Sequence, residues 1–191
     1  MRLSSADKSV LLSIARESIA RAVGGREPAG AREVSAMLRE PAGVFVTLEL
    51  HRELRGCIGY VEPVLPLAEA TREVAAKAAL EDPRFDPVTS GELSEIEIEI
   101  SVLSPLHEIH SPDEVTVGVH GLVLESGFRR GLLLPQVATD YGWDRFEFLS
   151  HTARKAGLPP DAWKRPGARL STFTVERFSE QELPEHSDDN Q

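Results

Sequence analysis

The run LRGCIGY at residues 54–60 places the chain's single cysteine, Cys57, between two glycines and two positions after Arg55. The apolar and β-branched residues of the run predict a strand, in which alternate side chains point to the same face. Arg55 and Cys57 would then share a face, about 6.5 Å apart at roughly 3.3 Å per residue. A neighbouring cation favours the thiolate, the reactive form of cysteine. The pair therefore predicts the floor of a cleft, where Arg55 holds an anionic group and Cys57 reacts with the ligand or contacts it.

The two glycines of the run, Gly56 and Gly59, fit the same hypothesis. Gly59 would keep the face of Cys57 open, and Gly56 would allow a neighbour to approach closely on the other face. A structural interpretation competes with it, because free cysteines are often buried as small apolar side chains and Arg55 could pair with a surface carboxylate. The sequence leaves both interpretations open.

Three residues elsewhere could complete such a site. The run DPRF places Asp82 and Arg84 in a loop, where Asp82 could fix the turn and Arg84 could bind an anion. An ordinary Asx turn before the proline explains these two residues equally well. His120 precedes a glycine in a predicted turn and is a candidate general base for the thiol, although histidines are also common in turns without such a role.

Other motifs point away from metal and nucleotide chemistry. His107 and His110 lie three apart, but prolines flank them and no cluster of cysteine and histidine completes a ligand set. The glycine-rich run SGFRRG lacks the strand and helix of a phosphate-binding loop. We therefore expect no metal and no cofactor.

The composition is that of an ordinary globular protein, with 41% hydrophobic and 27% charged residues in a chain of 191. The net charge is -10, the isoelectric point is about 5.1, and no run is rich in lysine or arginine, so nucleic acid is not expected as a partner. No apolar run approaches the roughly 20 residues that span a bilayer, and charged residues interrupt the N-terminal apolar segment. A single cysteine fits a reducing compartment. We expect a cytoplasmic protein without a membrane partner.

The elements that must position these residues follow from hydrophobic periodicity. Repeats at helical spacing predict helices over residues 5–22, 67–80 and 143–156. Apolar and β-branched runs predict a hairpin over 43–61, a half-buried strand over 94–103, three strands over 114–135 and a last strand over 169–178. Because strands and helices do not alternate regularly, we expect an α+β fold, a single domain with a mainly antiparallel sheet and covering helices.

Four runs in this order, LRGCIGY, DPRF, VHGLVLE and LLLPQVATDYGWDRFEFLSHTARKAGL, resemble the AMMECR domain family. Its bacterial and archaeal members are called AmmeMemoRadiSam system protein A. The resemblance covers roughly residues 6–178, and the hexapeptide LRGCIG stands without a change. It implies a domain over 1–178 in two lobes, with the hexapeptide lining a cleft between them. The remaining residues, 179–191, form an acidic tail that we expect to be disordered.

The resemblance also implies partners, a Memo-like protein and a radical S-adenosylmethionine protein. We accordingly expect a component of a redox or modification pathway that binds a small anionic ligand, with Cys57 and His120 as the candidate catalytic residues. The candidate ligand-binding residues are Arg55, Gly56, Gly59, Asp82 and Arg84. The alternative is a non-catalytic adaptor, which should show a broad apolar patch for a partner protein instead of a small polar pocket.

Overall fold

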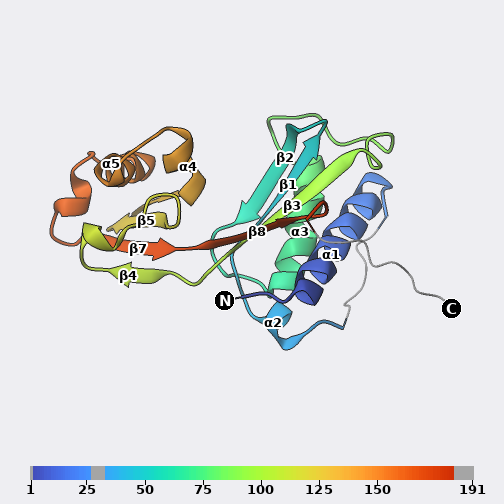
Figure 1. The fold of residues 1–191 in the computed structure, drawn as a ribbon. Helices are drawn as coiled ribbons and strands as arrows, with labels where there is room; N and C mark the ends of the chain where they lie inside the picture. The colour runs from blue at the N-terminus through green and yellow to red at the C-terminus, as the bar shows by residue number, and fades with distance from the viewer. Residues whose placement is uncertain (1, 27–32, 183–191) are drawn as a thin grey trace. The chain divides into compact units, whose positions relative to one another are not determined.

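The computed structural model of the chain describes residues 2–26 and 33–182 (Figure 1). These residues form helices and two antiparallel four-stranded sheets, which confirms the predicted α+β class. The chain divides into two compact units, Met1–Val102 with Glu176–Gln191, and Leu103–Val175. Most of the predicted acidic tail lies outside the described residues. Within the described ranges, no helix combines the length and the apolar character needed to cross a membrane.

The first unit is built on a sheet with the strand order β2-β1-β3-β8. Two of its helices, at 5–23 and 67–80, confirm the helices predicted there. Its elements are α1 (Ser5–Val23), α2 (Ala36–Arg39), β1 (Val44–Leu50), β2 (Glu53–Tyr60), α3 (Leu67–Leu80), β3 (Ile96–Leu103) and β8 (Val175–Ser179).

Helices α1 and α3 pack with one face of this sheet (Figure 1). The alternating pattern of β1 buries Val44, Val46 and Leu48 completely, and they join Ile98 and Ile100 of β3 in one core with the apolar sides of the helices. The intervening side chains of each strand point the other way. We call the face opposite α1 and α3 the outer face.

A β-bulge interrupts the pairing of β1 with β2. Leu48 is opposite Gly56, whereas the next residue, Glu49, is opposite Leu54. Arg55 therefore has no partner on β1 and is the extra residue of the bulge. A bulge breaks the regular alternation of side chains and turns the extra residue in a new direction.

The second unit is built on a sheet with the strand order β4-β7-β5-β6. Helix α5 packs on β6 closely enough that a Cβ at Gly131 would lie 2.5 Å from the carbonyl oxygen of Thr152. The core beneath α5 includes Leu122, Leu124 and Phe148. The elements of this unit are β4 (His107–Ile109), η1 (Pro112–Glu114), β5 (Gly121–Ser126), β6 (Arg129–Leu133), α4 (Pro135–Asp140), α5 (Arg145–Lys155), η2 (Ala162–Lys164) and β7 (Arg169–Phe173).

Three predictions for the second unit need correction. The first of the strands predicted over 114–135 is instead a turn, because Gly118 adopts a φ of 81° and the carbonyl oxygen of Thr116 accepts hydrogen bonds from two residues that follow it. The last predicted strand, 169–178, is two strands that break at Thr174 and belong to different sheets. The helix predicted from residue 143 begins at Arg145, because the side chain of Asp144 caps its first turn.

Candidate functional site

Cys57 lies in β2, at one edge of the first sheet, with its side chain on the outer face. Thr47 of β1 is directly opposite in the register. The Thr47 hydroxyl donates a hydrogen bond to Cys57 Sγ across 3.2 Å. The cysteine is partly exposed, so the thiol is not sealed in the core.

The loop after α3 supplies hydrogen-bond partners for the backbone N–H and carbonyl groups of Cys57 in β2. The N–H group of Cys57 donates to Oδ2 of Asp82 across 2.8 Å, and Nη2 of Arg84 donates to the Cys57 carbonyl oxygen across 3.3 Å. An edge strand presents such groups without a strand partner. The loop residues of DPRF therefore take the place of a neighbouring strand at the one position that carries the thiol.

Asp82 and Arg84 form a bidentate ion pair beside the thiol. Nε of Arg84 donates to Oδ1 across 2.9 Å and Nη2 donates to Oδ2 across 2.7 Å. The Arg84 hydrogen bonds, followed by the N–H groups of Cys57 and Arg84, hold the pKa of Asp82 far below its ordinary value, against the effect of burial. The Asp82 side chain is only 2% exposed and that of Arg84 is 53% exposed. The pair thus turns its carboxylate inward and its cation toward solvent.

Arg84 also contacts Cys57, because its Nη2 donates to the Cys57 carbonyl oxygen. The pKa of Arg84 is raised, mainly by the hydrogen bonds to Asp82. No residue that the structure describes accepts a hydrogen bond from Nη1 of Arg84. Arg84 therefore has donors left for an external anion next to the thiol.

Arg55, by contrast, is occupied within the protein. Its Nε donates to Oε1 of Glu92 across 2.7 Å, and Nη1 donates to the carbonyl oxygen of Asp86 across 2.8 Å. Nη2 reaches Glu92 and the carbonyl oxygen of Pro87, each at 3.3 Å. The hydrogen bonds from Arg55 lower the pKa of Glu92 to about 2, with those from Thr89 contributing. Because the bulge turns Arg55 toward this loop, Arg84 and not Arg55 is the arginine that hydrogen bonds to Cys57.

Both glycines of LRGCIG are required by packing. A Cβ on Gly56 would lie 2.2 Å from the carbonyl oxygen of Ala78, so only glycine lets α3 approach β2 this closely. A Cβ on Gly59 would lie 2.3 Å from the ring of Phe45, its partner on β1. The Phe45 ring thus covers Gly59, where the sequence predicted an open face.

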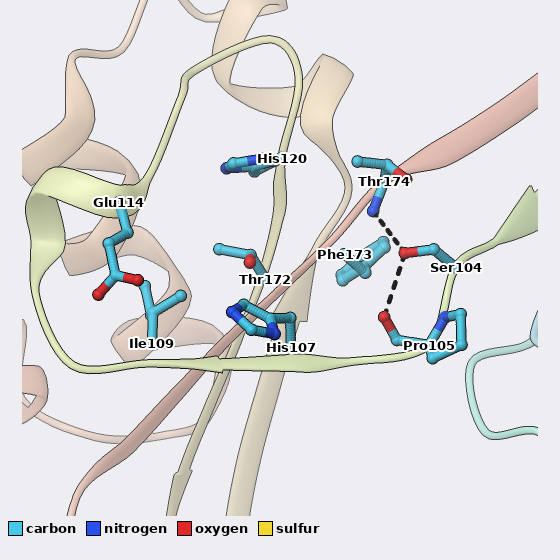
Figure 2. Close-up of a pocket in the computed structure, with 9 residues that line it drawn as sticks. All are labelled: Ser104, Pro105, His107, Ile109, Glu114, His120, Thr172, Phe173 and Thr174. Atoms are coloured by element: carbon cyan, nitrogen blue, oxygen red, sulfur yellow. Dashed lines mark hydrogen bonds between the residues drawn. The ribbon is translucent and has the colours of Figure 1, made fainter. Parts of the chain in front are cut away.

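His120 lies in the second unit, beside a pocket of about 210 Å³ (Figure 2). Its Nδ1 accepts a hydrogen bond from the N–H of Thr116 across 3.2 Å. The neutral ring therefore carries its proton on Nε2. His107 and Glu114 line the same pocket, but within residues 2–26 and 33–182 no group of three histidine, cysteine or acidic side chains is arranged to hold a metal ion. Cys57 and His120 belong to different units, and the role of His120 as a base for the thiol stays a prediction.

Sequence reasoning missed Thr47. Counting outward from the two-residue turn at His51 and Arg52 pairs Thr47 with Gly56, and the bulge at Arg55 shifts the partner of Thr47 to Cys57. No local signal marks that bulge. The hydroxyl at the thiol is therefore visible only in the structure.

Comparisons with known proteins agree on one family. The family model described as AMMECR1 matches residues 12–178. A protein of Thermofilum pendens is 45% identical over 196 residues, covering 94% of this chain and 92% of that protein. A protein of Methanothermobacter thermautotrophicus is 52% identical over 150 residues, covering 75% of this chain and 78% of that protein. The crystal structure of the uncharacterised protein PH0010 of Pyrococcus horikoshii matches with a TM-score of 0.83 and 39% identity, over 95% of both chains.

Proposed function

The chain belongs to the AMMECR1 family, and we propose that it binds a small anionic ligand beside Cys57, whose thiol is the candidate nucleophile. The observation that carries this proposal is the position of Arg84, whose half-exposed guanidinium donates to the Cys57 carbonyl oxygen while Asp82 holds it in place. Arg84 is the residue assigned to hold the anion, and Asp82 is its positioning residue.

A hydrogen-bond donor and a cation contact Cys57. The Thr47 hydroxyl donates to Sγ, and Nη2 of Arg84 donates to the carbonyl oxygen of the same residue. Hydrogen-bond donors and cations near a cysteine stabilise the thiolate, which is the nucleophile in cysteine chemistry. The sequence predicted His120 as the acceptor of the thiol proton; this role would require the hydrogen bond from Thr116 to Nδ1 to break, because Nε2 of the neutral ring already carries a proton.

Protection of the thiol by an anion tests the proposal. Iodoacetamide alkylates Cys57 alone, because the chain has no other cysteine. Inorganic phosphate, as a minimal anion, should slow this reaction in a saturable manner in the wild type and not in Arg84→Gln. Arg165→Gln is the matched control, since it removes a similarly exposed arginine that pairs with Asp161 in the second unit. Equal protection of wild type and Arg84→Gln would contradict the proposal.

We place this activity in the pathway that the family resemblance implies, as one step of a redox or modification sequence shared with a Memo-like protein and a radical S-adenosylmethionine protein. Mixing the purified proteins and measuring association by calorimetry tests for direct contact. If neither pair of proteins gives a heat of binding, direct contact is excluded. The proteins would then be connected only through a shared small molecule.

One surface supports the alternative of an adaptor. A groove of about 320 Å³ at the start of α3 is lined by Val34, Leu38, Pro66 and Ala68, with charged residues beside them. Such an apolar groove suits a partner protein's side chains. Under the adaptor alternative, the affinity of a partner protein should fall in Ala68→Glu and stay unchanged in Cys57→Ser. An affinity unchanged in Ala68→Glu would contradict this alternative.

A further inference from the structure

The pocket of the second unit lies at the end of its core. This core is formed between the sheet and the segments that cover it. His107, Thr172 and Leu122 are opposite one another on adjacent strands, so their side chains lie on the same face of the sheet. This face covers the core, since Leu122 is fully buried. The segment that holds Glu114 and His120 forms another side of the space. Figure 2 shows Thr172 between the two imidazoles, with Glu114 facing the same space. Polar side chains from separate strands and a turn thus converge on one small hollow.

Thr172 gives the clearest sign that the pocket is built for a ligand. The residue is only 5% exposed and lies in β7, a central strand of the sheet. No hydrogen bond joins its hydroxyl to another described residue, and no unpaired side-chain oxygen or nitrogen of the described residues is fully buried. The hydroxyl is therefore accessible from the pocket that the residue lines. A ligand in the pocket can pair with this hydroxyl in place of water.

Glu114 supplies a fixed negative charge on another side. Its Oε1 accepts hydrogen bonds from the N–H groups of His110 and Ser111, each across 2.9 Å. These bonds lower the pKa of Glu114, so the carboxylate stays charged. Among the described residues none donates to Oε2, which remains available to a cationic donor. An ammonium group suits this position, since it is compact and offers three donors.

His120 supplies a donor of fixed identity. Because Nδ1 accepts from the backbone N–H of Thr116, Nε2 carries the proton of the neutral ring. The Nε2 proton and the Thr172 hydroxyl can together bind an anionic oxygen, and His107 on β4 is a further donor on that side. The pocket thus combines a negative end with an end of neutral donors.

From this arrangement we propose that the second unit binds a small zwitterion, with an ammonium group at Glu114 and a carboxylate or similar oxyanion at His120 and Thr172. The volume of about 210 Å³ limits the ligand to the size of a small amino acid. The site shares His120 with the thiol chemistry proposed for Cys57, but none of the groups that contact the thiol lines this pocket.

Binding of ω-amino acids to the full chain tests this proposal. Glycine, β-alanine and 4-aminobutyrate are the probes, because they vary the distance between the two charges. The readouts are the NMR signals of the Thr172 methyl group and of the His107 and His120 rings. At least one probe should shift all three signals in a saturable manner, and propionate and propylamine, which carry one charge each, should bind at least ~10-fold more weakly.

Two variants decide whether the named groups are responsible. Thr172→Val keeps the shape and removes the hydroxyl, and Glu114→Gln keeps an oxygen for the two backbone N–H groups while removing the charge. Each should weaken binding of the best probe by about 10-fold or more. Thr139→Val and Glu108→Gln, which do not line the pocket, are the matched controls and should leave the affinity unchanged. Absence of saturable shifts with all three probes, or wild-type affinity in Thr172→Val and Glu114→Gln, would overturn the proposal.

Discussion

The N–H group of Cys57 donates to the carboxylate of Asp82 across 2.8 Å, so one side chain holds both the backbone of Cys57 and the guanidinium of Arg84. Asp82 is buried and Arg84 is half-exposed. This arrangement explains the residue types in DPRF and at the centre of LRGCIG. The two runs are distant in the chain, since Cys57 and Asp82 lie 25 residues apart. Loop and strand act as one structural piece, and the predictions below test its parts.

Asp82→Asn should lower the free energy of unfolding by about 2 kcal/mol at pH 7, because hydrogen bonds to a charged group are worth roughly 1.5–3 kcal/mol. The difference between wild type and variant should depend on pH. Since folding lowers the pKa of Asp82 from 3.8, its contribution is fully present above about pH 4. It should be lost as the pH falls from there toward the folded-state pKa. Urea unfolding of both proteins between pH 3 and 7 measures this, and a difference that grows on acidification would contradict the assignment.

Gly56→Ala should destabilise the protein by about 3 kcal/mol, because the new methyl group would overlap the Ala78 carbonyl and force α3 away from β2. Gly91→Ala is the matched control. Its Cβ would have no neighbour closer than 3.9 Å, so it should change stability by no more than about 0.5 kcal/mol. Thermal melting of the two variants compares them, and equal melting temperatures would show that Gly56 is not required for packing.

The sequence predicted the strand of LRGCIGY and the residue types of the site. It placed Arg55 beside Cys57, where the structure has Arg84. Strict alternation predicts a shared face for Arg55 and Cys57 only in a regular strand. The bulge leaves Arg55 unpaired and directs it to Glu92. Arg84 reaches Cys57 from a loop whose path depends on long-range contacts, and such contacts have no signature in local spacing.

The second unit shows the same limit for secondary structure. Val115, Val117 and Val119 alternate with polar residues as in a strand, yet the chain turns at Gly118 because the backbone bonds locally to Thr116. Where the periodicity was long, as in α1 and α3, prediction and structure agree within one residue. A short apolar run does not distinguish a strand from a turn, because either structure can bury apolar side chains.

The hairpin turn between β1 and β2 offers a stabilising change. His51 and Arg52 have φ values of 53° and 68°, the conformation of a type I′ turn. Asparagine and glycine adopt these angles with less strain, so His51→Asn with Arg52→Gly should raise stability by about 1 kcal/mol. The His51 contact with Glu95 is exposed and its loss should matter little. Urea unfolding measures the change, and a destabilised double variant would refute this interpretation of the turn.

Glu92→Gln should loosen the loop over residues 81–95, since Glu92 receives Arg55 and the N–H and hydroxyl of Thr89. Amide hydrogen exchange in this loop should become at least several-fold faster, with little change in α1. Glu95→Gln is the control, because Glu95 is in the same loop and its side chain pairs with the exposed His51. Unchanged exchange in Glu92→Gln would mean that the Arg55 pair does not anchor the loop.

The proposed anion site is tested most directly by the ratio of alkylation rates of Cys57 with iodoacetate and with iodoacetamide. The two reagents differ by one negative charge, and the single thiol makes each rate unambiguous. Wild type should show a ratio about fivefold above that of Arg84→Gln, because one charge near 4 Å in water contributes about 1 kcal/mol. Arg165→Gln should keep the wild-type ratio. An equal ratio in wild type and Arg84→Gln, or a thiol that reacts only after denaturation, would contradict the assignment of Arg84 and Cys57 to one anion-binding site.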